Sequence, residues 1–301
     1  MELAMIGLGR MGGNMTARLI KGGHGVVAYD VSAAAADRAV ADGAARGDSL
    51  EAVINLLKPP RVIWIMLPAG RVTDETLNKL AGLLAPNDLV IDGGNSYYKD
   101  TVKRAGTLAQ RGIPYVDVGT SGGIWGNREG YCLMIGGDAA AVNRLRPIFE
   151  TLAPAADRGW AHVGPSGAGH FAKMVHNGIE YGLMQAYAEG FAILERRKDL
   201  VQDLSMVANL WGSGSVIRSW LLELITSALA ENPNLEGIRP YVSDSGEGRW
   251  AVAEAIDQNV SAPVITQSLL ERLRSRDDTA FADKLLATLR NKFGGHDVKK
   301  Q

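Results

Sequence analysis

The chain has 301 residues, of which 46% are hydrophobic and 22% are charged, and its formal net charge is −1. This composition is typical of a globular protein with room for two domains, and the near-zero charge excludes a general attraction to nucleic acid or to an anionic membrane. The only cysteine, Cys132, excludes an internal disulfide and a cysteine-cluster metal site, so no metal is expected. No apolar run approaches the roughly 20 residues that span a bilayer, and the N-terminus does not resemble a signal peptide. A cytoplasmic protein is the resulting expectation.

The first half of the chain alternates short apolar runs with helix-patterned segments. The predicted strands are bounded by Gly, Pro or Asp and cover residues 3–9, 25–30, 61–67, 88–94, 113–119 and 131–137. The predicted helices between them cover residues 10–21, 33–41, 71–84 and 98–111. This alternation predicts a parallel, doubly wound sheet, so residues 1–164 are expected to form a Rossmann-type domain.

After about residue 165 the pattern becomes helical throughout. Helices are expected at residues 167–196, 214–230, 247–259, 262–274 and 278–292. Residues 165–301 are therefore expected to form an all-helical domain, which makes the fold class α/β followed by all-α. Two expectations concern the core: Cys132 is predicted to be buried in its strand, and Trp211, Trp220 and Trp250 are predicted to pack inside.

A glycine motif stands at the first strand–helix junction. Gly7, Gly9 and Gly12 form the pattern GxGxxG, and Leu8, Arg10 and Met11 lie between them. The first glycine permits a tight turn, the second lets the backbone approach a pyrophosphate, and the third allows close helix–strand packing. Asp30 ends the next strand, where a carboxylate accepts hydrogen bonds from the ribose hydroxyls of NAD and repels the 2′-phosphate of NADP. The alternative is a plain glycine turn with a solvated aspartate.

Three later loops follow predicted strands and should line the same crevice, because ligands of doubly wound sheets bind at the carboxyl ends of the strands. The expected cofactor contacts there are Met66, Leu67, Pro68, Ala69 and Asn95. Asn95 could instead be an ordinary turn residue. The third loop offers a hydroxyl and backbone N–H groups that suit a carboxylate or phosphate, at Ser121, Gly122 and Gly123. A flexible loop explains these last three residues equally well.

A polar stripe lies in an otherwise apolar helical segment. Lys173, His176, Asn177 and Glu180 follow the spacing i, i+3, i+4, i+7 and so share one helix face. Burial disfavours the charged form of a lysine, which can make it a general base near neutral pH. A glutamate on the same face can carry a second proton, and the histidine and asparagine can hold hydroxyl and carboxylate groups. The alternative is a solvated helix face.

Six segments carry a resemblance to a known family: "GLGRMGGNM", "WIMLPAG", "DGGNSYYKDT", "DVGTSGG", "GAGHFAKMVHNGIEYG" and "KFGGH". Together they resemble the 6-phosphogluconate dehydrogenase family, and "KMVHNGIEY" separates it from the wider β-hydroxyacid dehydrogenases. Longer members carry a duplicated helical domain, so this chain is most similar to the compact, NAD-preferring branch, with which Asp30 agrees.

The resemblance implies the oxidative decarboxylation of 6-phosphogluconate to ribulose 5-phosphate with NAD. It implies that Lys173 is the general base and Glu180 the acid that protonates carbon 1 of the enediol. The residues implied to position the sugar acid are Asn95, Ser121, Gly122, Gly123, His176 and Asn177. The residues implied to bind its phosphate are Tyr181 and Arg272 of the same chain, with Arg290 and His296 reaching in from a partner subunit. A homodimer or a dimer-based tetramer with shared active sites is therefore expected.

One segment departs from the longer members of the family. Where they carry a lysine and a threonine near the phosphate, "SDSGEGRW" has Ser245 and Glu247, so either Arg249 takes over or the loop lies differently. Two other functions stay open: a β-hydroxyacid dehydrogenase that acts on a small unphosphorylated 3-hydroxy acid, and a non-catalytic dinucleotide sensor.

Overall fold

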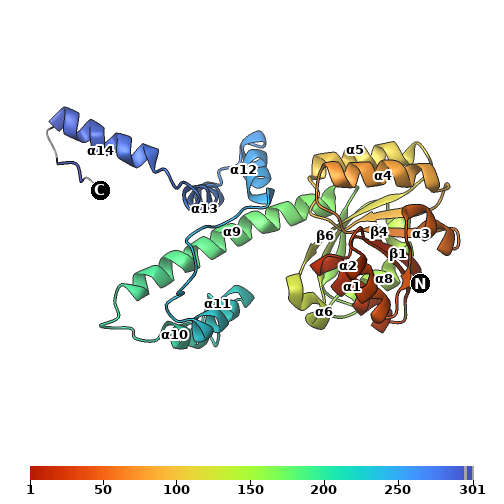
Figure 1. Cartoon of the computed structure of the whole chain (residues 1–301), viewed down its shortest axis with the longest axis horizontal. Coiled ribbons are helices and arrows are strands. Elements are labelled where there is room, and N and C mark those ends of the chain that lie inside the picture. Colours follow the sequence, from red (N-terminus) through yellow and green to blue (C-terminus); the bar gives the residue numbers. More distant parts are fainter. Residues whose placement is uncertain (295–296, 300–301) are drawn as a thin grey trace. The chain divides into compact units, whose positions relative to one another are not determined.

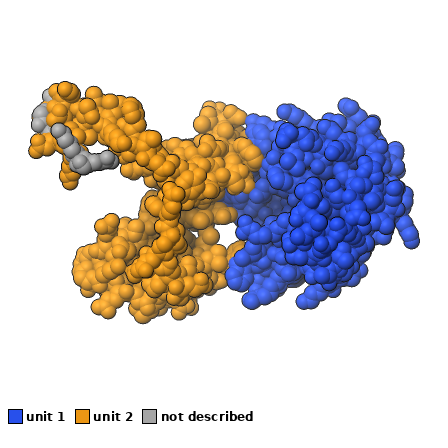
Figure 2. Space-filling model, in the orientation of Figure 1, with its two compact units in different colours: residues 1–177 blue, residues 178–301 orange. Residues whose placement is uncertain are grey.

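The structure is a computed structural model that describes residues 1–294 and 297–299. It consists of two compact units, which Figure 2 distinguishes by colour: unit 1 is Met1–Asn177 and unit 2 is Gly178–Gln301. Each unit is described by itself. The predicted domain boundary between residues 164 and 165 stays a prediction.

Unit 1 is built on one eight-stranded sheet (Figure 1). Its strands are β1 (Glu2–Ile6), β2 (Gly25–Tyr29), β3 (Ala45–Arg46), β4 (Val62–Ile65), β5 (Leu89–Asp92), β6 (Tyr115–Ser121), β7 (Cys132–Gly136) and β8 (Trp160–Gly164). The strand order is β3-β2-β1-β4-β5-β6-β7-β8. The order reverses direction between β1 and β4, which is the switch point where doubly wound folds bind dinucleotides. The predicted Rossmann-type fold is confirmed.

One pair of strands departs from the predicted parallel sheet. β6 and β7 pair antiparallel, with Ser121 opposite Cys132, whereas every other strand pair of the sheet is parallel. Only a short 3₁₀ turn, η1 (Gly123–Trp125), and a single helical turn, α6 (Gly126–Glu129), connect these strands. A parallel crossover needs about a dozen residues or more, so the chain turns back instead. The burial prediction for Cys132 is wrong, because its side chain is exposed.

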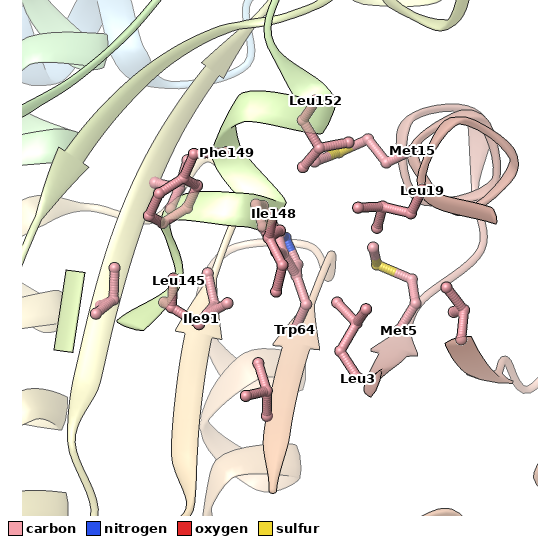
Figure 3. Packing of buried hydrophobic residues seen from close by; sticks show 14 of the residues in the cluster. Leu3, Met5, Met15, Leu19, Trp64, Ile91, Leu145, Ile148, Phe149 and Leu152 are labelled. Atoms are coloured by element: carbon pink, nitrogen blue, oxygen red, sulfur yellow. The ribbon is translucent and has the colours of Figure 1, made fainter. Parts of the chain in front are cut away.

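Helices cover both faces of the sheet and bury its apolar side chains. The remaining helices of unit 1 are α1 (Arg10–Lys21), α2 (Ala33–Ala41), α3 (Leu50–Leu56), α4 (Arg71–Leu83), α5 (Tyr98–Ala109), α7 (Ala139–Arg144) and α8 (Arg146–Leu152). Figure 3 shows one of the two cores, in which Met15 of α1 and Phe149 of α8 lie over Met5 and Trp64 of the sheet. The rings of Trp64 and Phe149 meet edge to face, 6.3 Å between centroids. Strands buried on both faces explain why they read as continuous apolar runs.

Unit 2 is helical. The long helix α9 (Ala168–Glu195) begins in unit 1 and continues into unit 2. The others are α10 (Leu204–Trp211), α11 (Trp220–Glu231), α12 (Glu247–Asp257), α13 (Pro263–Arg274) and α14 (Phe281–Gly294). α9, α10 and α11 share a small core of Phe191, Ala208, Leu222 and Leu229.

The segment predicted as one helix over 214–230 differs from the prediction. Its first residues form a loop, α11 starts only at Trp220, and the preceding α10 was not predicted. Gly214 has a φ of +77°, which breaks the helix, and Ser219 starts α11 by accepting a hydrogen bond from the Leu222 N–H. Trp220 is 46% exposed, so its assignment to the core is wrong. Within the described part of the chain, no helix is long and apolar enough to span a membrane.

Candidate active site

The glycine motif adopts the geometry that a dinucleotide site needs. Gly7 has a φ of +93°, and a Cβ there would lie 2.4 Å from the Met66 carbonyl oxygen. A Cβ on Gly12 would lie 1.9 Å from the carbonyl oxygen of Gly7, so α1 packs directly on the loop. Gly9, by contrast, has no neighbour within 4 Å of its would-be Cβ. The first and third glycines are therefore fixed by packing, whereas the second exposes backbone to a ligand, which fits a bound pyrophosphate.

Asp30 holds the glycine loop against the end of β2. Its Oδ2 accepts a hydrogen bond from the Leu8 N–H at 2.6 Å, and its Oδ1 accepts one from the Ser32 N–H at 2.7 Å. Each carboxylate oxygen has a second lone pair, which leaves capacity for a ribose hydroxyl. The next cationic side chain in the sequence is Arg38, within α2, so no cation directly follows Asp30 to attract a 2′-phosphate.

The loops after β4 and β5 pack against each other. Met66 and Leu67 are half-buried, whereas Pro68 and Ala69 are exposed. A Cβ on Gly94 would lie 2.6 Å from the Leu67 carbonyl oxygen, so the two loops are in backbone contact. In the second loop the side chain of Asn95 is exposed. The predicted cofactor residues of unit 1 thus share the carboxyl edge of the sheet around the switch point.

A buried carboxylate that the sequence reasoning missed holds the Asn95 loop. Asp92 ends β5 and is fully buried; its Oδ1 accepts from the Gly94 N–H at 3.1 Å. Its Oδ2 accepts from Ser96 Oγ and from the Tyr115 hydroxyl, both at 2.8 Å. Burial and the adjacent Asp92 raise the pKa of Tyr115 well above its usual value, so the phenol remains a donor. The position of this aspartate, between an apolar strand and "GGNS", could have indicated its role in holding the loop.

Ser121, Gly122 and Gly123 lie at the end of β6. Gly122 has a φ of +134° and Gly123 one of +52°, conformations that favour glycine. Ser121 Oγ lies 3.5 Å from Nε2 of His176, and Nδ1 of His176 lies 3.0 Å from Oδ1 of Asn177. The structure therefore brings the predicted substrate loop to the polar face of α9 within unit 1.

Glycines let α9 lie directly on the sheet. A Cβ on Gly119 of β6 would lie 2.5 Å from both the Gly169 carbonyl oxygen and the Cβ of Lys173. A Cβ on Gly169 would lie 2.4 Å from the Met134 carbonyl oxygen. Backbone contact of this closeness needs residues without side chains. This contact places Lys173 beside Gly119 of β6. Gly119 in turn precedes Ser121 of the substrate loop by two residues.

Asp117 fixes the start of the same helix. It is a fully buried residue of β6, and its carboxylate accepts hydrogen bonds from the Gly167 N–H at 2.7 Å and from the His170 N–H at 2.9 Å. These are N–H groups at the start of α9, which a carboxylate satisfies well. His170 in turn lies 2.7 Å, Nδ1 to Oγ1, from Thr101 of α5. A charged residue within the apolar run "YVDVG" could have indicated this role.

The polar stripe of α9 is buried where it crosses unit 1. Lys173 is 7% exposed and Asn177 8%, while His176 is half-buried. Charged side chains are seldom fully buried unless they are paired or functional. The interpretation as a solvated helix face is therefore wrong for Lys173 and Asn177, whereas His176 and Glu180 are half-buried.

Unit 2 brings together Tyr181 and Arg272, both predicted to bind phosphate. Glu180 is half-buried and Tyr181 is buried. The guanidinium carbon of Arg272 lies 3.4 Å from the centroid of the Tyr181 ring, and Arg272 Nη1 donates to the Ser243 carbonyl oxygen at 3.1 Å. Arg272 Nη2 also donates to Met184 Sδ at 3.6 Å, and stacking of this kind holds the guanidinium in a fixed orientation.

The departing segment packs next to this pair. A Cβ on Gly248 would lie 2.5 Å from Cε2 of Tyr181. Glu247 is buried and accepts a hydrogen bond from Ser245 Oγ. Arg249 Nε donates to Oδ1 of Asp244 at 3.0 Å. Hydrogen bonds from Arg249 and from Arg276 lower the pKa of Asp244, so Arg249 is paired and not held ready for a phosphate.

The two residues predicted to act in a partner's site lie near the C-terminus. Arg290 is exposed on α14. His296 lies outside the described residues. The same helix exposes large apolar side chains, Phe281, Leu285, Leu286 and Leu289.

Comparison with known proteins agrees with this arrangement. Residues 2–164 match the family model described as the NAD binding domain of 6-phosphogluconate dehydrogenase, and residues 169–299 match the C-terminal domain of 6-phosphogluconate dehydrogenase. A Haloferax volcanii protein named as NAD(+)-dependent, decarboxylating 6-phosphogluconate dehydrogenase is 45% identical over 100% of this chain and 99% of its own. A Bacillus subtilis enzyme of the same name is 33% identical over 95% of this chain, which spans 64% of it.

Among solved structures, a Plasmodium falciparum 6-phosphogluconate dehydrogenase matches with a TM-score of 0.85 and 26% identity. The match covers 100% of this chain and 66% of that one. A Mycobacterium tuberculosis 3-hydroxyisobutyrate dehydrogenase, at a TM-score of 0.75 and 24% identity, shares the fold over 93% of this chain and 94% of its own. The expected resemblance, the fold class and NAD as the cofactor are confirmed.

Proposed function

Because the chain belongs to the 6-phosphogluconate dehydrogenase family, we propose that it oxidises and decarboxylates 6-phosphogluconate to ribulose 5-phosphate with NAD. The observation that carries this proposal is Lys173: a buried lysine that Gly119 and Gly169 place against β6, with Ser121, His176 and Asn177 nearby. A buried amine among groups that bind hydroxyls and carboxylates suits proton abstraction from a sugar acid.

The residues of the chain divide the proton transfers between them. NAD, held by the glycine loop and Asp30, would supply the acceptor for the hydride of carbon 3. Lys173 takes the proton of the carbon 3 hydroxyl, which becomes a ketone β to the carboxylate. As CO2 leaves, the electrons of the broken carbon–carbon bond pass to the ketone oxygen, and protonated Lys173 stabilises the resulting enediolate by a charge-assisted hydrogen bond. Glu180 then protonates carbon 1 of the enediol, which was carbon 2 of 6-phosphogluconate, and this gives ribulose 5-phosphate.

The remaining residues hold the two ligands. Gly7, Gly9, Gly12 and Asp30, together with Leu8, Arg10, Met11 and Met66–Ala69, are proposed to bind NAD. Asn95, Ser121–Gly123, His176 and Asn177 are proposed to bind the sugar acid. Tyr181 and Arg272 are proposed to bind its phosphate, since the stacked guanidinium supplies charge in a fixed geometry.

One observation favours a second candidate function. The buried carboxylate of Glu247 lies next to the Tyr181–Arg272 pair through Gly248, and a carboxylate beside a phosphate is unfavourable. A β-hydroxyacid dehydrogenase acting on a small unphosphorylated 3-hydroxy acid would avoid that conflict. Full-length similarity to a 6-phosphogluconate dehydrogenase supports the first candidate.

NADH formation measured with three acids separates the candidates. We expect 6-phosphogluconate to give the highest kcat/KM, with gluconate and 3-hydroxyisobutyrate lower by at least roughly 100-fold, because each lacks the charged contact to Arg272. Release of one CO2 per NADH should accompany turnover. Equal use of gluconate and 6-phosphogluconate would contradict the proposal.

Cofactor choice is expected to depend on Asp30. The wild-type protein should prefer NAD over NADP by roughly 100-fold or more in kcat/KM, because a 2′-phosphate would lie against the carboxylate. Asp30→Asn should narrow that ratio to about tenfold or less. The substitution should also weaken the binding of NAD. The Leu8 and Ser32 N–H groups donate to different oxygens of Asp30, and an asparagine side chain has only one acceptor oxygen. Asp42→Asn, an exposed carboxylate at the end of α2, is the control and should leave the ratio unchanged.

We further propose that active sites are shared between the subunits of a dimer. Arg290 and His296 would bind the phosphate in the partner's site. The exposed apolar side chains of α14, including Phe281, Leu286 and Leu289, support a protein interface along this helix. Arg290→Ala should then raise the KM for 6-phosphogluconate by roughly ten- to a hundredfold, the value of one charge-assisted contact.

Mixing two impaired chains tests this sharing, with 6-phosphogluconate held well below the wild-type KM so that Arg290→Ala homodimers contribute little activity. In a heterodimer of Arg290→Ala with Lys173→Met, one site carries both changes and the other carries neither. Random exchange should restore activity to about a quarter of the wild-type level, since half of the dimers are mixed and each has one intact site. Exchange is verified with differently tagged chains. No recovery in a mixture that contains heterodimers would show that Arg290 serves its own subunit.

A further inference from the structure

The buried carboxylate of Asp92 lies at the centre of a hydrogen-bond network. The proposed reaction gives Asp92 no role. It accepts hydrogen bonds from the backbone of Gly94, from the hydroxyl of Ser96 and from the hydroxyl of Tyr115. Arg104 approaches from α5, with Nη1 at 2.9 Å from Ser96 Oγ and at 3.5 Å from Asp92 Oδ2. Two of these contacts are made by residues on either side of Asn95.

The network also reaches the neighbouring helix. Nε of Arg104 donates to Oδ1 of Asp74 at 2.8 Å, in the first turn of α4. Burial lowers the pKa of Arg104, but the hydrogen bond to Asp74 and the charges of Asp92 and Asp74 outweigh that effect and raise it, so the guanidinium stays charged. Asp92 thereby joins β5 and its following loop to β6, α4 and α5.

The geometry leaves the loop little freedom other than at Asn95. A Cβ on Gly93 would lie 2.3 Å from Nε1 of Trp64, and one on Gly94 would lie 2.6 Å from the Leu67 carbonyl oxygen. Ser96 is buried, whereas Asn95 between these fixed residues is exposed. We propose that Asp92 is a positioning residue: it wraps residues 93–96 around its carboxylate and so fixes the direction in which Asn95 points. This inference rests on the proposed role of Asn95 in ligand binding.

A double-mutant cycle tests whether Asp92 acts through Asn95. Asn95→Ala alone should lower kcat/KM by roughly ten- to a hundredfold, the value of one or two hydrogen bonds to a ligand. Asp92→Asn alone should lower it by a similar factor, because a misdirected Asn95 no longer meets its ligand. In the Asn95→Ala background, Asp92→Asn should cost less than about twofold, since nothing remains to be positioned.

The other buried aspartate of the same strand region supplies a matched control. Asp88 precedes β5 and accepts hydrogen bonds from the Arg61 N–H at 2.6 Å and the Ala85 N–H at 2.9 Å, at the opposite end of the strand. Asp88→Asn should lower the Tm by about as much as Asp92→Asn does. Its effect on kcat/KM should be the same whether residue 95 is asparagine or alanine, because the Asp88 contacts do not involve the Asn95 loop.

A milder variant keeps the test decisive if Asp92→Asn does not fold. Tyr115→Phe removes one hydrogen bond to Asp92 and preserves the shape of the ring; it should lower kcat/KM by about threefold to tenfold with asparagine at position 95 and by less than about twofold with alanine. For Asp88→Asn, the loss of kcat/KM is expected to multiply with that of Asn95→Ala. If the losses for Asp92→Asn and Tyr115→Phe multiply with it in the same way, the proposal is overturned.

The choice of substrate separates this inference from the proposed function. All kcat/KM values are measured with whichever of the three acids the wild-type protein oxidises best. If that acid is not 6-phosphogluconate, the proposed function fails while the cycle still reports on Asp92. If 6-phosphogluconate is the substrate and the losses multiply, only the inference about Asp92 fails.

Discussion

Lys173→Met is expected to lower kcat by about 10⁴-fold or more, the upper end of what one general acid–base group contributes. The loss should be this large because the same amine is proposed to act twice: as the base that deprotonates the carbon 3 hydroxyl and as the donor that stabilises the enediolate. Methionine fills a similar volume and carries no charge. The substitution at this position, which is only 7% exposed, should therefore not unfold the protein.

Pre-steady-state and steady-state NADH formation measure the effect of Lys173→Met. The Tm and the Kd for NADH serve as tests of folding and should stay close to the wild-type values. Lys103→Met, a lysine whose side chain is 80% exposed on α5, is the matched control and should keep full activity. Retention of more than about a hundredth of wild-type kcat in Lys173→Met would contradict the assignment.

Gly119→Ala is expected to lower both the stability of unit 1 and the catalytic rate. The added Cβ would lie 2.5 Å from two atoms that cannot rotate away, the Gly169 carbonyl oxygen and the Cβ of Lys173. Helix α9 must move from the sheet, which should cost about 1–3 kcal/mol of unfolding free energy. A displacement of about 1 Å at Lys173 should also lower kcat by roughly 100-fold.

Thermal unfolding and kcat together measure the effect of Gly119→Ala. Gly106→Ala is the control: Gly106 lies in α5, where an added Cβ would meet no atom within 4 Å. That substitution should leave kcat unchanged and should raise the unfolding free energy by about 0.5–1 kcal/mol, because alanine is a better helix former. If Gly119→Ala keeps wild-type Tm and kcat, the close contact between α9 and β6 is not required.

The longer helices of unit 1 were predicted from the sequence, whereas the shorter α3 and α8 were missed, although their buried apolar residues follow a helical spacing. Helices over 10–21 and 33–41 were predicted with their observed bounds, since apolar spacing and flanking glycines mark them clearly. β8 was missed because its residues are exposed or half-buried and form no apolar run. The two-residue β3 is too short to show any period. The direction of β7 depends on the length of a connection, which strand patterns do not encode.

The candidate site was predictable where motifs carry chemistry and unpredictable where distant residues meet. Gly7, Gly12 and Asp30 stand in a recognisable order, so their roles in the loop could be expected. The meeting of Gly119 with Gly169 could not, because isolated glycines in two separate segments give no sign that they touch. The same holds for the pairing of Arg249 with Asp244, which depends on the loop before α12.

The contact between α9 and β6 also bears on how the protein responds to temperature. Side-chain packing loses precision on warming as rotamers become populated, whereas the atoms that meet at Gly119 and Gly169 belong to the backbone and to one Cβ and have no rotamers. The start of the Lys173 side chain is therefore located by hard contact between main chains, and vibration about that contact has a small amplitude while the fold persists. We expect the catalytic amine to keep its anchor point up to the onset of unfolding, so that heat inactivation follows the loss of the fold and does not precede it.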